Sequence, residues 1–463
     1  MDDEQRQPVL LNWSLSSRAE VKPRVSEGRA DSSVSAQKSK IPMFPTKLME
    51  EVVRGENVKK ALERVETNAG SPGVDGMKTE KLRGYLRQHW LRIREELLEG
   101  TYSPQPVRRV EIPKPDGSGV RKLGIPSVVD RFIQQSVLQV MQGKWDRTFS
   151  ECSFGFRPGR SAHQAVAKAQ SYLREGYGFV VDLDLEKFFD RVNHDKLMSS
   201  LAARVEDKRV LKLIRAFLNA GVMEDGLVKP TEEGTPQGGP LSPFLSNVVL
   251  DELDKELEER GHRFVRYADD CNIYVKSERA GLRVMESVKR FISQRLKLKV
   301  NESKSAVAWP QKRKFLGFSF TSGKEPNRRK IAPQAIVRFK TKVRVLTNKN
   351  RGRSVEQVVE DLSSYLPGWE GYFGYCETPR IFTDLDSWIR RRLRGLMWKQ
   401  WKTFRRRRAE LMARGLSTKD AAQTAMSSLG PWKMSRVPNV QRALSKAYFD
   451  SIDLPRLAEL RNI

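Results

Sequence analysis

Residues 264–275 read Phe-Val-Arg-Tyr-Ala-Asp-Asp-Cys-Asn-Ile-Tyr-Val. The β-branched and aromatic residues on both sides of the acidic pair predict two short strands, so Asp269 and Asp270 are expected near the tip of a hairpin. Adjacent carboxylates repel one another unless a cation keeps them ionised, and a hard divalent ion such as Mg2+ takes oxygen ligands of this kind. A solvated Asp-Asp turn is the alternative for the dipeptide on its own.

A second acidic stretch, residues 179–185, has the alternation of a strand with one apolar face and with Asp182 and Asp184 on the other. If this strand and the hairpin lie in one sheet, Asp184 joins Asp269 and Asp270. Three such carboxylates are what a two-metal phosphoryl-transfer site needs. One ion would activate an attacking 3′-hydroxyl, and the other would hold a triphosphate.

The chain of 463 residues carries 85 Lys and Arg against 57 Asp and Glu, a net charge of +28. So strong a positive field attracts polyanions, and nucleic acid is the expected partner. No apolar run approaches the roughly 18 residues of a spanning helix, so we expect no membrane partner. Three scattered cysteines and four unpaired histidines argue against a zinc site and for a reducing compartment. The acidic start lacks the features of a secretory signal or transit peptide, so we expect a cytoplasmic protein.

Residues 1–45 are polar, with sparse apolar positions, which predicts a disordered tail. Apolar spacing then predicts one helix, ending in a glycine-rich turn at 68–76. Residues 107–126 hold two strand-like runs around a Pro-Asp-Gly-Ser-Gly turn, which predicts a β-hairpin. It would bring Lys114 and Arg121 together, where they could grip a triphosphate or form only a solvated basic surface.

Three further segments suggest contacts with a nucleotide or template. Residues 153–161 mix aromatics with arginines, which suits stacking and phosphate contact but also suits an ordinary core. Phe188-Phe189-Asp190 is predicted to open a helix. Residues 234–247 are rich in glycine and proline, and Ser242 is predicted to cap the helix that follows. That loop could be a floor for a nucleotide, or a helix-capping loop without a ligand.

The C-terminal third is predicted to be strongly basic. An amphipathic helix over 280–300 and a strand at 315–318 come first, and from about residue 324 the pattern predicts helices only, with Ser354 and Thr383 as caps. Residues 331–463 hold 26 Lys or Arg against 12 Asp or Glu, an excess of 14 that is half the net charge. Cations interleaved with tryptophans favour a grip on RNA or primer-template over a solvated helix face. The candidate RNA-binding residues are Arg390, Arg391, Arg392 and Arg394.

Taken in order, these segments resemble the reverse transcriptases encoded by bacterial group II introns, over roughly residues 46–463. The resemblance rests on the basic hairpin, Ser153-Phe154-Gly155-Phe156-Arg157-Pro158, Asp184 with Phe188-Phe189-Asp190, Thr235-Pro236-Gln237-Gly238, Tyr267-Ala268-Asp269-Asp270 and Phe315-Leu316-Gly317-Phe318. It implies an α+β right-hand polymerase with an antiparallel-sheet palm. Fingers would span 46–175, the palm 176–323 with residues about 225–243 packing toward the fingers, and a helical thumb and maturase region 324–463.

The resemblance also implies roles for single residues. Asp184, Asp269 and Asp270 would be catalytic and hold two Mg2+ ions, with Asp182 in support. The residues that would bind the incoming dNTP are the cations Lys114 and Arg121, Gln237 beneath the nucleotide, Phe189 as the bulky residue that excludes a ribose 2′-hydroxyl, and Lys304 near the triphosphate.

The implied function is an RNA-directed DNA polymerase that also serves as a maturase in splicing and mobility of a group II intron. Its partners would be the intron RNA, an RNA or DNA template with a DNA primer, and dNTPs. Two alternatives stay open: a domesticated host or defence reverse transcriptase of the same fold, and a non-catalytic RNA splicing cofactor. Three intact carboxylates argue against the cofactor. No His-Asn-His or paired-cysteine cluster follows the basic helices, so we do not expect cleavage of target DNA.

Overall fold

The computed structural model describes residues 44, 46–113, 119–224, 227–229, 233–235, 238–349 and 352–460. The N-terminal tail predicted to be disordered lies outside the described residues, apart from Phe44. The predicted dNTP contacts Lys114 and Gln237 also lie outside them.

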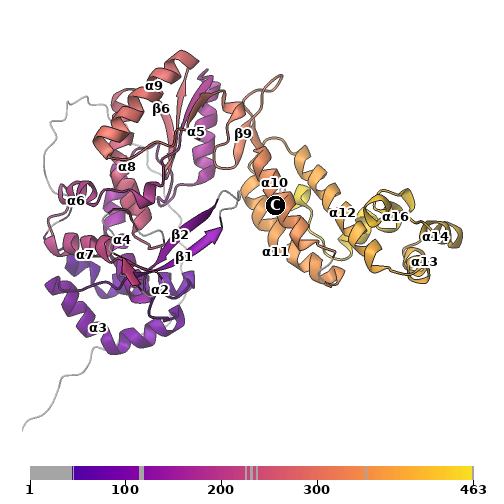
Figure 1. The fold of residues 1–463 in the computed structure, drawn as a ribbon, viewed down its shortest axis with the longest axis horizontal. Coiled ribbons are helices and arrows are strands. Elements are labelled where there is room, and N and C mark those ends of the chain that lie inside the picture. Colours follow the sequence, from indigo (N-terminus) through magenta and orange to yellow (C-terminus); the bar gives the residue numbers. More distant parts are fainter. Residues whose placement is uncertain are drawn as a thin grey trace, which may run out of the picture. The chain divides into compact units, whose positions relative to one another are not determined.

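A four-stranded antiparallel sheet joins the two acidic stretches (Figure 1). Its strands, in spatial order, are β6 (Arg263–Tyr267), β7 (Asp270–Val275), β3 (Phe179–Leu183) and β8 (Ala306–Ala308). The β6–β7 hairpin and the placement of β3 beside it are both as predicted, because each strand alternates residues between two faces and each face has apolar residues to bury.

Both faces of this sheet are covered. Val181 and Leu183 of β3 belong to a core that includes residues of α8 (Ser242–Glu259) and α9 (Glu278–Phe291). On the other face Val180 packs in a second core with α5 (Ala162–Arg174) and the C-terminal helices. The helix α5, which lies within the predicted fingers, therefore shares a core with helices of the predicted thumb.

The segment before the sheet combines helices with the basic hairpin. The single helix predicted after residue 45 is wrong, because Arg54 adopts an extended conformation and splits it. The helix over 82–99 was not predicted. The basic hairpin is confirmed, with Ile112 paired to Arg121, and its first strand also pairs in parallel with a later strand. The elements are α1 (Leu48–Val52), α2 (Gly55–Asn68), α3 (Leu82–Glu99), β1 (Val107–Pro113), β2 (Val120–Ile125), α4 (Val128–Trp145), β4 (Val222–Glu224) and β5 (Leu227–Lys229).

Two helix starts in the middle of the chain differ from the prediction. Phe188–Asp190 is one 3-10 turn, and the helix begins only at α6 (His194–Ala202), where the Asn193 side chain accepts a hydrogen bond from the Lys196 N–H. After α7 (Lys208–Asn219), α8 has Leu241 at its cap position, so Ser242 is its first residue and not its cap. In the second case a polar residue near the helix start was taken as its cap, and in the first a single 3-10 turn was taken as the start of the helix.

The segment 315–318, predicted as a strand, is a tight turn. Leu316 and Gly317 have φ angles of 51° and 82°, and the Phe315 and Phe318 backbones hydrogen-bond to each other. A strand begins only at β9 (Phe318–Phe320), and it pairs with β10 (Arg329–Ile331). The prediction of helices only after residue 324 is therefore wrong at its start.

Helices follow to the end of the described chain. Ser354 caps α11 as predicted, in a capping box with Gln357, whereas Thr383 lies inside α12, which begins at Arg380. No helix in the described ranges is long and apolar enough to cross a membrane. The helices are α10 (Pro333–Leu346), α11 (Val355–Phe373), α12 (Arg380–Gln400), α13 (Phe404–Ala413), α14 (Thr418–Ala425), α15 (Pro431–Met434), α16 (Pro438–Ala443), α17 (Lys446–Asp450) and α18 (Leu457–Leu460).

Candidate functional site

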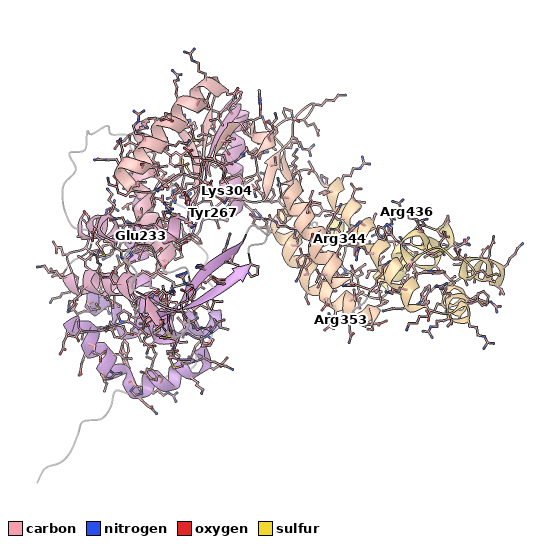
Figure 2. All side chains as sticks on the ribbon, viewed as in Figure 1. Glu233, Tyr267, Lys304, Arg344, Arg353 and Arg436 are labelled. Carbon is pink, nitrogen blue, oxygen red and sulfur yellow. The ribbon has the colours of Figure 1, made fainter. Side chains whose placement is uncertain are left out.

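The acidic turn is the connection between β6 and β7. Tyr267 pairs with Asp270 across the hairpin, so Ala268 and Asp269 form a two-residue turn. Ala268 has a left-handed φ of 56°, as such a turn requires. Figure 2 labels Tyr267 at the start of this turn. The turn therefore presents two consecutive carboxylates at one end of the sheet.

Asp184 lies beside this turn because of strand register. Leu183 ends β3 and pairs with Cys271 of β7, and Asp184 is the next residue. The Asp184 N–H donates to Ser305 Oγ at 3.0 Å, and its carbonyl oxygen accepts from the Asn301 N–H at 2.8 Å. The segment that leads into β8 thus fixes the main chain of Asp184 on both sides.

The carboxylates at this end of the sheet repel one another. Burial raises the pKa of Asp270 to about 7, and the negative charges of Asp269, Asp182 and Asp184 add to the rise. Burial likewise raises the pKa of Asp269, and the charge of Asp184 adds to it, whereas the Arg121 guanidinium opposes it. Arg121 is exposed on β2, yet its charge acts on the acidic turn.

Crowded carboxylates of this kind fit a hard divalent cation, which would relieve their repulsion. In the part of the chain that is described, no three His, Cys, Asp or Glu side chains are grouped so that they could hold a metal ion. Lys304 Nζ lies 3.6 Å from an Asp184 carboxylate oxygen, and Arg313 lies 2.5 Å from Asp182. The donor chemistry suits Mg2+, and a cation bound by Asp184 would replace its pairing with Lys304.

A buried arginine that the sequence analysis did not single out supports the acidic turn from behind. Arg266 is fully buried and forms an ion pair with fully buried Asp254 of α8, at 2.5 and 2.6 Å. It also donates to Ser153 Oγ at 2.8 Å, to Asn247 Oδ1 at 3.0 Å and to the Ala268 carbonyl oxygen at 2.9 Å. One guanidinium therefore ties the turn to α8 and to the 153–161 loop.

The 153–161 loop closes on the same turn. A Cβ on Gly155 would lie 2.2 Å from the Ala268 nitrogen, so only glycine fits there. The Gly155 carbonyl oxygen accepts from Asn247 Nδ2 at 2.8 Å. Phe154 is buried in the second core, and buried Arg157 donates to neighbouring carbonyls and to Asp146, so both are internal supports and not phosphate contacts.

A cavity of about 530 Å3 contains the predicted sugar-selecting residue. Phe189 lines it together with Phe156, Arg131 and the backbone of Gly238–Gly239. Buried Arg131 donates to the Ser71 carbonyl oxygen at 2.8 Å, while burial lowers its pKa and its Nε has no hydrogen-bond partner. Arg131 is a candidate ligand contact that was missed, because a lone arginine in an apolar helix gives no motif.

A second cavity, of about 420 Å3, lies on the C-terminal helices and is called here the arginine cavity. It is lined by Ser387, Trp388, Arg390, Arg391, Arg394, Ser435, Arg436 and Gln441. Three of the four arginines predicted to bind RNA therefore meet there, joined by Arg436, which Figure 2 labels.

The fourth predicted arginine, Arg392, points elsewhere. Its Nε donates to Thr347 Oγ1 at 2.6 Å, which ties α12 to the end of α10. It also lies 5.7 Å from the Trp388 ring centroid. Arg392 is two residues from both Arg390 and Arg394, and residues two apart on a helix face different directions, so it does not line the cavity with them.

Comparison with known proteins agrees with this arrangement. The reverse transcriptase (RNA-dependent DNA polymerase) family matches residues 112–320, and the group II intron maturase-specific domain matches residues 336–415. Protein YkfC of Escherichia coli is 34% identical over 52% of this chain and 72% of its own length. Group II intron-encoded protein LtrA of Lactococcus lactis is 29% identical over 59% of this chain and 56% of its own length.

A chain of the solved "Partial Cas6-RT-Cas1--Cas2 complex" is 25% identical with a TM-score of 0.35, over 53% of this chain and 42% of that one. The two family matches follow one another in the order that the sequence analysis implied, and the first includes the acidic turn and Asp184. The chain belongs to the group II intron-encoded reverse transcriptases, in which an RNA-directed DNA polymerase domain is followed by a maturase domain.

Proposed function

We propose that this chain copies RNA into DNA at the acidic turn, with Asp184, Asp269 and Asp270 as ligands of two Mg2+ ions. The observation that carries the proposal is the register that sets β3 beside β7, so that Asp184 and the acidic turn share one end of the sheet. When bound, the two ions would stabilise the attacking 3′-oxygen and the departing pyrophosphate.

The neighbouring side chains would bind and orient the nucleotide. Arg121 lies close enough to influence Asp269 and would bind the triphosphate from the hairpin side. Lys304 would exchange its pairing with Asp184 for a phosphate oxygen when the nucleotide enters. Lys114 and Gln237 keep the roles that the resemblance implies.

Phe189 would select the sugar, because its ring lines the 530 Å3 cavity and would fill the space that a 2′-hydroxyl needs. Phe189→Ala should therefore incorporate ribonucleotides measurably better than the parent. Primer extension with dNTPs and rNTPs in parallel measures the ratio. An unchanged preference would move the selecting residue elsewhere.

The division into fingers (46–175), palm (176–323) and thumb with maturase region (324–463) is part of the proposal. The basic C-terminal helices would bind the group II intron RNA, assist its splicing and mobility, and hold the primer-template. Support comes from the match to the maturase-specific domain and from the excess of 14 positive charges after residue 330.

The decisive experiment is extension of a DNA primer on an RNA template by the purified chain, with dNTPs and Mg2+. Extension that disappears when Mg2+ is chelated is the expected result. A chain that binds intron RNA with high affinity but never extends a primer would be a non-catalytic splicing cofactor, and the polymerase proposal would be withdrawn.

A further inference from the structure

The arginine cavity has two walls from different parts of the chain. One wall is a face of α12, whose lining residues Ser387, Arg391 and Arg394 follow the i, i+4, i+7 spacing of one helix face. The other wall carries Arg436, just after α15, and Gln441 of α16. The maturase-specific match ends at residue 415, so it includes the first wall and not the second.

The positive charges in this cavity have no carboxylate among the lining residues. Burial lowers the pKa of Arg394 to about 10, with repulsion from Arg390 adding to the fall. Burial also lowers the pKa of Arg391, and Arg436 adds to it. The nearby Asp386 carboxylate accepts from the backbone N–H groups of α18, at 3.0 and 3.1 Å. Asp386 also interacts with Arg390, so an anion from outside would chiefly neutralise Arg391, Arg394 and Arg436.

The guanidiniums are held in place before any ligand arrives. Arg391 lies 3.7 Å from the centroid of the Trp432 ring, and its Nε donates to Ser435 Oγ at 3.4 Å. The Arg394 Nε donates to the Leu444 carbonyl oxygen at 2.9 Å. A guanidinium has five N–H donors, so these contacts fix each group and leave donors for a phosphate.

The cavity is concave and larger than a phosphate needs, and Trp388 is among its lining residues. A regular duplex presents its phosphates on a convex, stiff surface, whereas a bulged or looped nucleotide can turn its phosphate and base into a hollow. Bases stack on aromatic rings with little dependence on sequence. We infer that the arginine cavity binds one unpaired nucleotide of the bound RNA, with its phosphate on Arg391, Arg394 and Arg436 and its base beside Trp388.

This inference rests on the proposed RNA binding and adds the kind of RNA feature that is recognised. The test uses Arg436→Gln in the full chain, because Arg436 is exposed and its loss should not disturb folding. Lys433→Gln is the matched control, since Lys433 is also exposed, lies on α15 and does not line the cavity. The probes are two RNA hairpins of equal length, one with a single-nucleotide bulge and one fully paired.

Arg436→Gln should weaken binding of the bulged hairpin about tenfold, a loss of about 1.4 kcal/mol, because one charged hydrogen bond to the phosphate is removed. It should also lower the salt slope by about 0.7, the value for one single-strand phosphate. Binding of the paired hairpin should change no more than it does in Lys433→Gln. Equal losses on both hairpins, or no loss on either, would overturn the inference. A competition experiment with an acidic peptide gives one more contradicting outcome. If the peptide displaced the bulged hairpin from the parent, and if Arg436→Gln weakened peptide binding as much as hairpin binding, the cavity would be a peptide site.

Primer extension on the same preparations separates this inference from the proposed function. If the parent extends a primer and binds both hairpins equally, with no effect of Arg436→Gln, only the nucleotide pocket fails. If the parent neither extends a primer nor binds RNA, both the proposed function and the nucleotide pocket are contradicted.

Discussion

The acidic turn brings negative charges close together, and the arginine cavity brings positive charges close together. In each site a ligand of the opposite charge would neutralise part of that charge. At the turn, burial and mutual repulsion raise the pKa values of Asp269 and Asp270. In the cavity, burial and repulsion lower those of Arg391 and Arg394. A divalent cation would relieve the first site and a phosphate the second.

The two regions differ in how their charged groups are supported. The turn is held from behind by Arg266, a fully buried charge with a buried carboxylate partner in Asp254. In the cavity, Arg391 and Arg394 are fixed by a tryptophan ring, a hydroxyl and a carbonyl oxygen, all neutral. A catalytic turn needs one rigid geometry, whereas a binding cavity needs charges that remain available to the ligand.

Removing the support of the acidic turn should have the largest effect. Arg266→Met leaves Asp254 as an unpaired buried charge, which costs about 3–5 kcal/mol of unfolding free energy. Primer extension should be lost as the turn moves. Denaturant titration and extension assays check both effects. The double variant Arg266→Met, Asp254→Leu is the control. It should regain stability, because no buried charge is left unpaired, but it should not regain primer extension. Full extension by the double variant would show that the hydrogen bonds of Arg266 do not position the turn.

The two sites should also respond differently to pH. Asp270 must lose its proton to bind a metal, and its pKa is raised to about 7, so Mg2+ binding should strengthen as pH rises from 6 to 8. If one proton is released on binding, the Mg2+ affinity should rise by at most about tenfold per pH unit at pH values below that pKa. The Mg2+ concentration for half-maximal extension measures this. RNA affinity should stay constant over the same range because the cavity arginines remain charged, and parallel pH dependences would contradict the comparison.

Substitution of Arg392 should have the smallest effect on stability and RNA affinity. It distinguishes arginines that support the fold from arginines that bind RNA. Arg392→Gln loses the hydrogen bond to Thr347, so unfolding free energy should fall by about 1 kcal/mol. RNA affinity should change no more than in Lys433→Gln. Thermal unfolding and RNA titration of both variants check this. A tenfold loss of RNA affinity in a folded Arg392→Gln protein would show that Arg392 itself contacts RNA.

Local sequence patterns predicted three of the four strands of the central sheet, whereas the edge strand β8 was not predicted. Alternation over 179–185 and the β-branched and aromatic residues on both sides of Asp269 and Asp270 predicted strands and a turn. A shared site for the three carboxylates then favoured an arrangement in which those strands are neighbours. The same reasoning failed at 315–318, where apolar residues suggested a strand. Leu316 adopts a left-handed conformation there, which a non-glycine residue does not reveal in sequence.

The support of the acidic turn was present in the sequence but not recognised. Arg266 was read as one residue of a strand, although a charge between apolar neighbours on a central hairpin needs a buried partner. That partner, Asp254, occupies a core-facing position of α8 between Leu253 and Leu257. An acid within an apolar helical stripe was the available signal. Arg436 gave no such signal, because the fold brings it to α12 from 42 residues beyond Arg394.

The central claim is that chemistry resides at the acidic turn and RNA binding at the C-terminal helices. Asp269→Asn keeps the shape of the side chain and removes one charged metal ligand. The most direct measurement is primer extension by this variant on an RNA template, at an RNA concentration that saturates binding. We predict that extension is abolished while the affinity for RNA stays within about twofold of the parent. Extension at the parental rate would contradict the assignment of the site.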